Sequence, residues 1–209
     1  MTFQTGSKAD TIHDDIVSCI RNLLEDTEFS VRYCAAEALG ALGTSAARNS
    51  RVGPSLVRCL DDPAENVRYA AGNAIGKLPN LGVHRTKALG KVLNNLRSSD
   101  PETRKTACNL VGAIDTEWSR NGSIVRQVRK RLRDPDWDVR EHAAKAFISN
   151  KKVSACSRTA IVGLLHCLTD REFEVREASA EALGAMMRSG LRLFHVGGVT
   201  IAKQLSDPI

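Results

Sequence analysis

The sequence predicts an all-α fold, a right-handed α-solenoid of stacked antiparallel helix pairs with a period of 36 residues. The first observation is an arginine that recurs at constant spacing. It stands at Arg32, Arg68, Arg104, Arg140 and Arg176. The second is a set of apolar columns in the same register, and the third is an aromatic content of only 4%. A core of Ala, Leu, Ile and Val suits close helix packing better than a sandwich of bulky strands.

Other residues repeat together with the arginine, so the period does not rest on one residue type. A leucine stands eight residues before it: Leu24, Leu60, Leu96, Leu132 and Leu168. Apolar residues stand twelve before it, at Ile20, Leu56, Val92, Val128 and Leu164, and seven after it, at Leu39, Ile75, Val111, Phe147 and Leu183. Eight residues after it come Gly40, Gly76, Gly112, Ile148 and Gly184. These columns indicate a tandem array whose helices approach closely.

Each unit is expected to hold two helices, helix A and helix B, joined by a short polar turn. Helix A of the fifth unit is visible in residues 160–168, where apolar residues recur at spacings of three and four: Ile161, Leu164, Leu165 and Leu168. An aspartate follows in the turn, as at Asp62. Helix B of the fourth unit is expected from about Val139 to Phe147. Since one pair cannot bury both its apolar faces, stacking against neighbours must complete the core.

The third unit departs from the pattern because Ser98 replaces the turn aspartate. Asp100 followed by Pro101 nevertheless fits a helix N-cap with proline at the first helical position. Asp136 holds the matching place in the fourth unit, so the register continues without a gap.

The repeats cover almost the whole chain, and residues 1–209 are expected to form a single repeat domain. The expected units are residues 10–43, 47–79, 83–115, 119–151 and 155–187. Residues 190–209 suggest helix A and the turn of a partial sixth unit, in which Gly197-Gly198 is only a weak break. Because terminal repeats normally carry a polar cap, we expect a monomer or a piece of a longer array.

The recurring core of the units resembles HEAT repeats. It reads Asp26, Val31-Arg32, Ala35 and Ala38-Leu39-Gly40 in the first unit, and returns as Asp170, Val175-Arg176, Ala178 and Ala182-Leu183-Gly184 in the fifth. The pattern departs at Ser98, Thr103 and Ile148. The resemblance implies that turn aspartates and arginines bond between stacked repeats. It therefore implies a structural role for Asp26, Asp62, Asp134 and Asp170 and for the five arginines.

Catalytic and metal-binding patterns are absent from the sequence. The five histidines share no repeat column, and the six cysteines form no C-x-x-C pair, so no metal and no cofactor is expected. No nucleophile elbow or glycine-rich phosphate loop occurs. The sequence favours a protein that is not an enzyme, with a HEAT-like lyase or glycosylase as the third alternative. Trp137 shares a column with Phe29 and Phe173, and we expect these rings to pack against the turn and Trp118 to pack in the core.

Composition and the termini suggest a cytoplasmic or nuclear protein. Residues 1–10 contain no apolar run of the signal-peptide type, and no stretch has the length of a membrane span, so no membrane partner is expected. The cysteines are expected to be small buried side chains in a reducing compartment. The net charge of +6 permits an anionic partner without requiring one.

Basic residues concentrate in the predicted A helices. The strongest patch belongs to the fourth unit, where Arg126, Arg129, Lys130 and Arg133 stand without interleaved acids. This patch predicts, as the second alternative, binding of nucleic acid or another acidic partner.

The positions one and five residues after the repeated arginine are expected to point away from the core on helix B. They read Tyr33 and Glu37, Tyr69 and Asn73, Lys105 and Asn109, Glu141 and Lys145, and Glu177 and Glu181. Residues four apart share a helix face, and this row varies between units while the core columns repeat. We therefore predict an interaction scaffold that holds a protein partner in a concave groove lined by the B helices.

Overall fold

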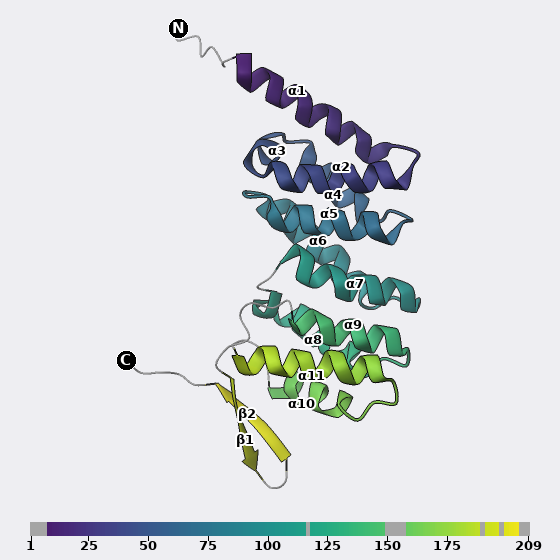
Figure 1. The fold of residues 1–209 in the computed structure, drawn as a ribbon, viewed down its shortest axis with the longest axis vertical. Coiled ribbons are helices and arrows are strands. Elements are labelled where there is room, and N and C mark those ends of the chain that lie inside the picture. The colour runs from purple at the N-terminus through teal and green to yellow at the C-terminus, as the bar shows by residue number, and fades with distance from the viewer. Residues whose placement is uncertain (1–7, 116–117, 149–157, 189–190, 197–198, 205–209) are drawn as a thin grey trace, which may run out of the picture. The chain divides into compact units, whose positions relative to one another are not determined.

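The computed structural model describes residues 8–115, 118–148, 158–188, 191–196 and 199–204 (Figure 1). The elements of the first 89 residues are α1 (Lys8–Asn22), the 3₁₀ turn η1 (Leu23–Glu25), α2 (Phe29–Leu42), α3 (Thr44–Arg48), α4 (Val52–Cys59) and α5 (Glu65–Lys77), followed by the start of α6 (Gly82–Asn95). After α6 come α7 (Pro101–Ile114), η2 (Trp118–Arg120), α8 (Gly122–Arg131), α9 (Trp137–Ile148), α10 (Arg158–Cys167), α11 (Phe173–Arg188), β1 (Leu191–Val196) and β2 (Val199–Gln204).

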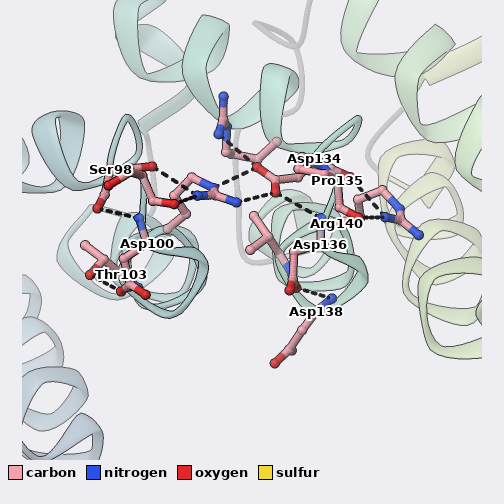
Figure 2. Close-up of polar contacts among 12 residues, drawn as sticks. Ser98, Asp100, Thr103, Asp134, Pro135, Asp136, Asp138 and Arg140 are labelled. Atoms are coloured by element: carbon pink, nitrogen blue, oxygen red, sulfur yellow. Dashed lines mark hydrogen bonds and ion pairs between the residues drawn. The ribbon is translucent and has the colours of Figure 1, made fainter.

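Each 36-residue unit of the sequence contains helices on both sides of its polar turn. The B helices are α2, α5, α7, α9 and α11, and each begins three residues before its repeated arginine. The predicted all-α repeat fold is confirmed from α1 to α11. The expected cap of the third unit is also confirmed, since the Asp100 carboxylate accepts a hydrogen bond of 2.7 Å from the Thr103 N–H and Pro101 opens α7 (Figure 2).

The chain divides into two compact units, residues 1–89 and residues 90–209, with the division inside α6. The expectation of one continuous domain therefore stays a prediction. In the first unit α2 packs along α5, and α4 packs against α5 (Figure 1). A Cβ added at Gly40 would lie 3.1 Å from the Cα of Ala74, so this close approach of α2 and α5 favours glycine.

In the second unit α9 packs between α7 and α11, while α10 packs against α8 and α11 (Figure 1). Two aromatic rings pack against each other in the core of this unit. Trp118 and Phe147 are both fully buried and meet edge to face, with ring centroids 5.2 Å apart. The predicted packing role of Trp118 is confirmed.

The segment after α11 is a β-hairpin rather than a helix. β1 pairs antiparallel with β2, and Val196 lies opposite Val199. The predicted helix A of a partial sixth unit over residues 190–209 is therefore wrong for residues 191–196 and 199–204. Alternating and β-branched residues on both sides of Gly197-Gly198 form a hairpin signal, although the two glycines themselves lie outside the described residues.

The cysteines differ in environment. Cys59, Cys108 and Cys167 are buried, as expected, whereas Cys19 and Cys34 are exposed and Cys156 lies outside the described residues. Burial raises the pKa of the Cys59 thiol to about 11 and that of Cys108 to about 12. No helix among the described residues is long and apolar enough to cross a membrane.

Candidate interaction surface

The repeated arginine links each turn to the B helix that follows it through hydrogen bonds. In every unit its Nη1 donates to two main-chain oxygens, those of the residues six and five positions earlier. This contact also holds in the third unit, where Arg104 bonds the carbonyls of Ser98 and Ser99 at 3.0 and 2.8 Å. The contact needs only backbone acceptors, which is why the arginine recurs even where the turn aspartate is missing.

The same arginines reach the turn aspartate of the next unit. Arg32 pairs with Asp62, Arg104 with Asp134, and Arg140 with Asp170, each through two hydrogen bonds of 2.7–2.9 Å. The structural role implied by the family resemblance is confirmed for these three pairs. Such planar two-point contacts fix the positions of the guanidinium and the carboxylate together. The pairs thus hold the beginnings of successive B helices in register within each compact unit.

Asp134 has the most enclosed carboxylate of the three. Its side chain is fully buried and accepts from Arg104 Nε and Nη2, from Arg131 Nη1 at 2.8 Å, and from the Asp136 N–H at 3.2 Å (Figure 2). The hydrogen bond that Arg104 donates to Asp134 is the main cause that raises the pKa of the Arg104 guanidinium. Two arginines therefore neutralise one buried acid.

These carboxylates should make the fold sensitive to acid. The hydrogen bond from Arg140 lowers the pKa of Asp170. At Asp62, burial acts to raise the pKa of the carboxylate. Hydrogen bonds from Arg32 and from the Ala64 N–H outweigh burial, so the pKa of Asp62 is also lowered. A carboxylate whose pKa is lower in the folded state stabilises the fold at pH values above its unfolded-state pKa of about 4. This contribution is lost as the pH falls through the folded-state pKa. We expect the free energy of unfolding to decline below about pH 4.

Urea denaturation between pH 7 and pH 2.5, about the accessible range for carboxylate titration, measures this decline. Asp170→Asn should reduce the slope against pH because the substituted side chain does not titrate. An unchanged slope would contradict the assignment of Asp170.

The ten side chains predicted to point away from the core all reach solvent. Five of them are exposed, namely Glu37, Tyr69, Lys145, Glu177 and Glu181. The other five are half-buried, namely Tyr33, Asn73, Lys105, Asn109 and Glu141. Adjacent helices bring them together as two groups: those on α2 and α5 in the first compact unit, and those on α7, α9 and α11 in the second. Whether they line a concave groove stays a prediction.

The structure adds three aromatic residues to this surface. Phe29, Trp137 and Phe173 are 52%, 42% and 61% exposed, so a large part of each ring faces solvent, and packing of the rest against the turn stays a prediction. Each is the first residue of its B helix. In α9 and α11 the valine two positions later is fully buried, and two residues correspond to about 200° around a helix. The ring therefore faces solvent because the valine faces the core.

We call the helix B positions three before, one after and five after the repeated arginine the outward row. Residues at these positions are spaced by four and share one helix face. On α9 the row reads Trp137, Glu141 and Lys145; on α11 it reads Phe173, Glu177 and Glu181. In the sequence, the aromatic column stands four residues before the first of the predicted outward positions. This spacing was the signal that could have assigned the rings to the same surface.

Charges on the row differ between helices. On α9, Glu141 accepts an ion pair of 2.7 Å from Lys145, and Lys105 of α7 reaches the Asp138 carboxylate at 3.3 Å. On α2, the negative charge of Glu37 is the main cause that raises the pKa of the Tyr33 phenol, with burial and a hydrogen bond to the same carboxylate adding to it. Glu177 and Glu181 have no ion pair within the described part of the chain.

A family model of HEAT repeats matches residues 7–76 and 86–184. The chain belongs to the HEAT-repeat family. No curated protein sequence matches it. The fold is similar to that of an engineered protein, 21% identical with a TM-score of 0.52 over 82% of this chain and 79% of that one.

Two further solved structures resemble the HEAT chain. A designed armadillo repeat protein is 21% identical, with a TM-score of 0.50 over 87% of each chain. YibA of Escherichia coli is 17% identical, with a TM-score of 0.54 over 88% of this chain and 65% of that one. At these identities the likenesses show the solenoid fold alone, and they place no partner on the outward row.

One cluster on the HEAT chain has metal-ligand atoms close together. Asp138, Glu141 and His142 offer ligand atoms within 4.8 Å of one another. Both carboxylates already contact an ammonium group, that of Lys105 or of Lys145. A divalent cation would have to compete with two positive charges there, and the absence of a bound metal stays a prediction.

The basic residues predicted as an anion-binding patch lie on and just after α8. Arg126, Lys130 and Arg133 are exposed, and the half-buried Arg129 donates a hydrogen bond of 2.6 Å to the Thr159 hydroxyl. α8 itself contains no acidic residue. Since residues 126, 129 and 130 are spaced by three and four, these three cations share one face of α8, and Arg133 follows in the turn after it.

Proposed function

We propose that this HEAT-repeat protein is a non-enzymatic scaffold that binds a partner protein along the outward row. The observation that carries the proposal is the distribution of exposed rings. Ten large hydrophobic side chains are exposed among the described residues, and every aromatic one of them lies on this row: Phe29, Tyr69, Trp137 and Phe173. Aromatic residues offer much contact area at little cost in rotamer entropy and often dominate interface energies.

The proposed partner contacts α2 and α5 through aromatic anchors. Tyr69 is 47% exposed and Tyr33 is half-buried beside Glu37, and the two helices that present them pack side by side. Neighbouring helix axes lie about 8–10 Å apart. One extended segment of a partner can contact both rings at that spacing.

The row on α11 favours contact with a basic stretch of a partner. Glu177 and Glu181 are exposed one helical turn apart, and like charges at this spacing destabilise a helix by about 0.2–0.5 kcal/mol. The exposed Phe173 ring stands one turn before them. Lysine or arginine from a partner would relieve the repulsion and stack on the ring.

Two double variants test the proposal by capture of partners from a native extract. Tyr33→Ala with Tyr69→Ala should weaken capture more than about tenfold, since anchors of this kind contribute about 2 kcal/mol or more each. Glu177→Lys with Glu181→Lys should weaken capture and change its dependence on salt, because only this variant alters charge. Melting temperatures should stay within a few degrees of the wild type, since surface substitutions change stability little.

The controls alter exposed residues away from the row. Val83→Ala with Val162→Ala removes two exposed apolar side chains, and Asp15→Lys with Glu25→Lys makes the same change in net charge as the glutamate variant. Both controls should capture the partner normally. Normal capture by the two row variants would rule out the outward row as the binding surface.

A second candidate function is binding of nucleic acid through the basic face of α8. Its support is the exposure of Arg126 and Lys130 on an acid-free helix and of Arg133 just after it. If nucleic acid is the ligand, affinity should fall steeply with salt, by a slope of about 0.9 per phosphate neutralised. Reversing Arg126, Arg129, Lys130 and Arg133 to Glu should abolish binding in an electrophoretic shift assay. Retained binding by that variant would exclude this face.

A further inference from the structure

A polar pocket of about 400 Å³ opens in the first compact unit. Asp14 and Ser18 of α1 form one wall, Ser45 and Arg48 of α3 another, and the connection to α4 contributes Asn49, Ser50 and Arg51. The volume lies within the usual range of small-ligand sites, about 300–1,000 Å³. The lining is entirely polar, so this site, which we call the α1–α3 pocket, does not suit an apolar ligand.

Asn49 ties the walls of the α1–α3 pocket together. Its side-chain Nδ2 donates to the Ser18 hydroxyl of α1 at 3.2 Å, while its Oδ1 accepts from the Arg51 N–H at 3.0 Å. One amide thus fixes the connection against α1 and holds the backbone of Arg51 at the rim. The pocket is therefore organised before any ligand enters.

The charges of the pocket are not neutralised within the protein. Arg48, Arg51 and Asp14 are exposed and have no ion-pair partner in the described ranges of the chain. Arg58, on the same compact unit, instead lies 2.7 Å from the Glu25 carboxylate. Two guanidinium groups with three neighbouring hydroxyls are donors suited to oxyanions, because a guanidinium presents a planar fork of N–H groups that matches phosphate geometry.

We propose that the α1–α3 pocket binds a phosphate monoester whose carrier holds a positive or N–H donor group next to the phosphate. Arg48 and Arg51 contact the phosphate oxygens, and the hydroxyls of Ser45 and Ser50 add neutral donors. Asp14 would repel a bare anion, so its place on the opposite wall selects a ligand with a donor for the carboxylate to accept. A phosphoserine fits this pattern, with its phosphate toward the arginines and its nitrogen toward Asp14. The proposal is independent of the outward row.

Titration calorimetry on the full chain tests the proposal with four probes: O-phospho-L-serine, an acetylated and amidated phosphoserine tripeptide, inorganic phosphate and L-serine. O-phospho-L-serine should bind at an ionic strength of about 0.15 M, near the physiological value, and L-serine should not. Comparable binding of the blocked tripeptide would identify a phosphorylated protein segment as the source of the ligand. Binding of the free amino acid alone would identify a small phosphate ester.

Three variants separate the site from general charge attraction. Arg48→Ala with Arg51→Ala should weaken O-phospho-L-serine binding at least tenfold, whereas Lys77→Ala with Lys87→Ala removes the same charge from exposed positions elsewhere and should not. Asp14→Asn should weaken O-phospho-L-serine binding but strengthen that of inorganic phosphate. Failure of every phosphate probe to bind the wild type, or equal losses in both double variants, would overturn the proposal.

Discussion

Replacing Asp134 by alanine should destabilise the protein by about 3–5 kcal/mol, the usual cost of removing one partner of a buried ion pair. The substitution leaves Arg104 and Arg131 without their carboxylate and the Asp136 N–H without its acceptor. Urea denaturation and a fall in melting temperature on the order of 10 °C measure the effect.

The matched control is Glu25→Ala, which breaks the pair between Glu25 and Arg58. That pair has the same 2.7 Å separation but side chains more than half exposed. Exposed pairs contribute about 0–1 kcal/mol, so the control should unfold almost like the wild type. Similar losses in the two variants would contradict the role of burial in this argument.

Leu132→Asp should destabilise the protein by about 4 kcal/mol or more, since it removes a buried aliphatic side chain and places a carboxylate among apolar groups. Leu132 is 1% exposed at the end of α8. Leu132 packs closely against α10, since a Cβ added at Gly163 would lie 2.8 Å from the Leu132 Cδ1. The Cys167 thiol also donates a hydrogen bond of 3.2 Å to the Leu132 carbonyl. Loss of helical circular dichroism at lower urea concentration measures the effect.

The same repeat column offers the control for this prediction. Leu168 holds the corresponding place in the fifth unit but is 37% exposed. Leu168→Asp should therefore cost about 1 kcal/mol or less, as for most surface substitutions. A loss as large as that of Leu132→Asp would show that the leucine column acts through something other than burial.

The repeat period made most of the fold predictable, because residues that recur at 36-residue spacing must occupy equivalent places in each helix pair. The contact of Arg140 with Asp170 is one such regular feature, and the cap at Asp100 followed from local chemistry. The predicted outward positions also reach solvent, as at Tyr69 and Glu177. Once the register of a helix is known, its periodicity determines which residues face the core.

The features that sequence reasoning missed depend on something other than the period. Exposure of Trp137 and Phe173 depends on which way the first residue of a helix points, and their shared repeat column did not give that direction. The hairpin of β1 and β2 lies where the repeated arginine column ends, so the register no longer guided the assignment. The α1–α3 pocket joins residues of two helices and a connection, at positions that carry no repeated signature.

The buried thiols give each compact unit its own chemical reporter of opening. Cys59 belongs to the first unit, and Cys108 and Cys167 to the second; burial raises the pKa of all three, so they stay protonated and unreactive while the fold is closed. After the exposed Cys19 and Cys34 have been blocked, alkylation at Cys59, Cys108 and Cys167 proceeds only through transient unfolding. The rate of alkylation at each of these cysteines, read by mass spectrometry, therefore compares the kinetics of local opening in the two units within a single chain that carries no substitution.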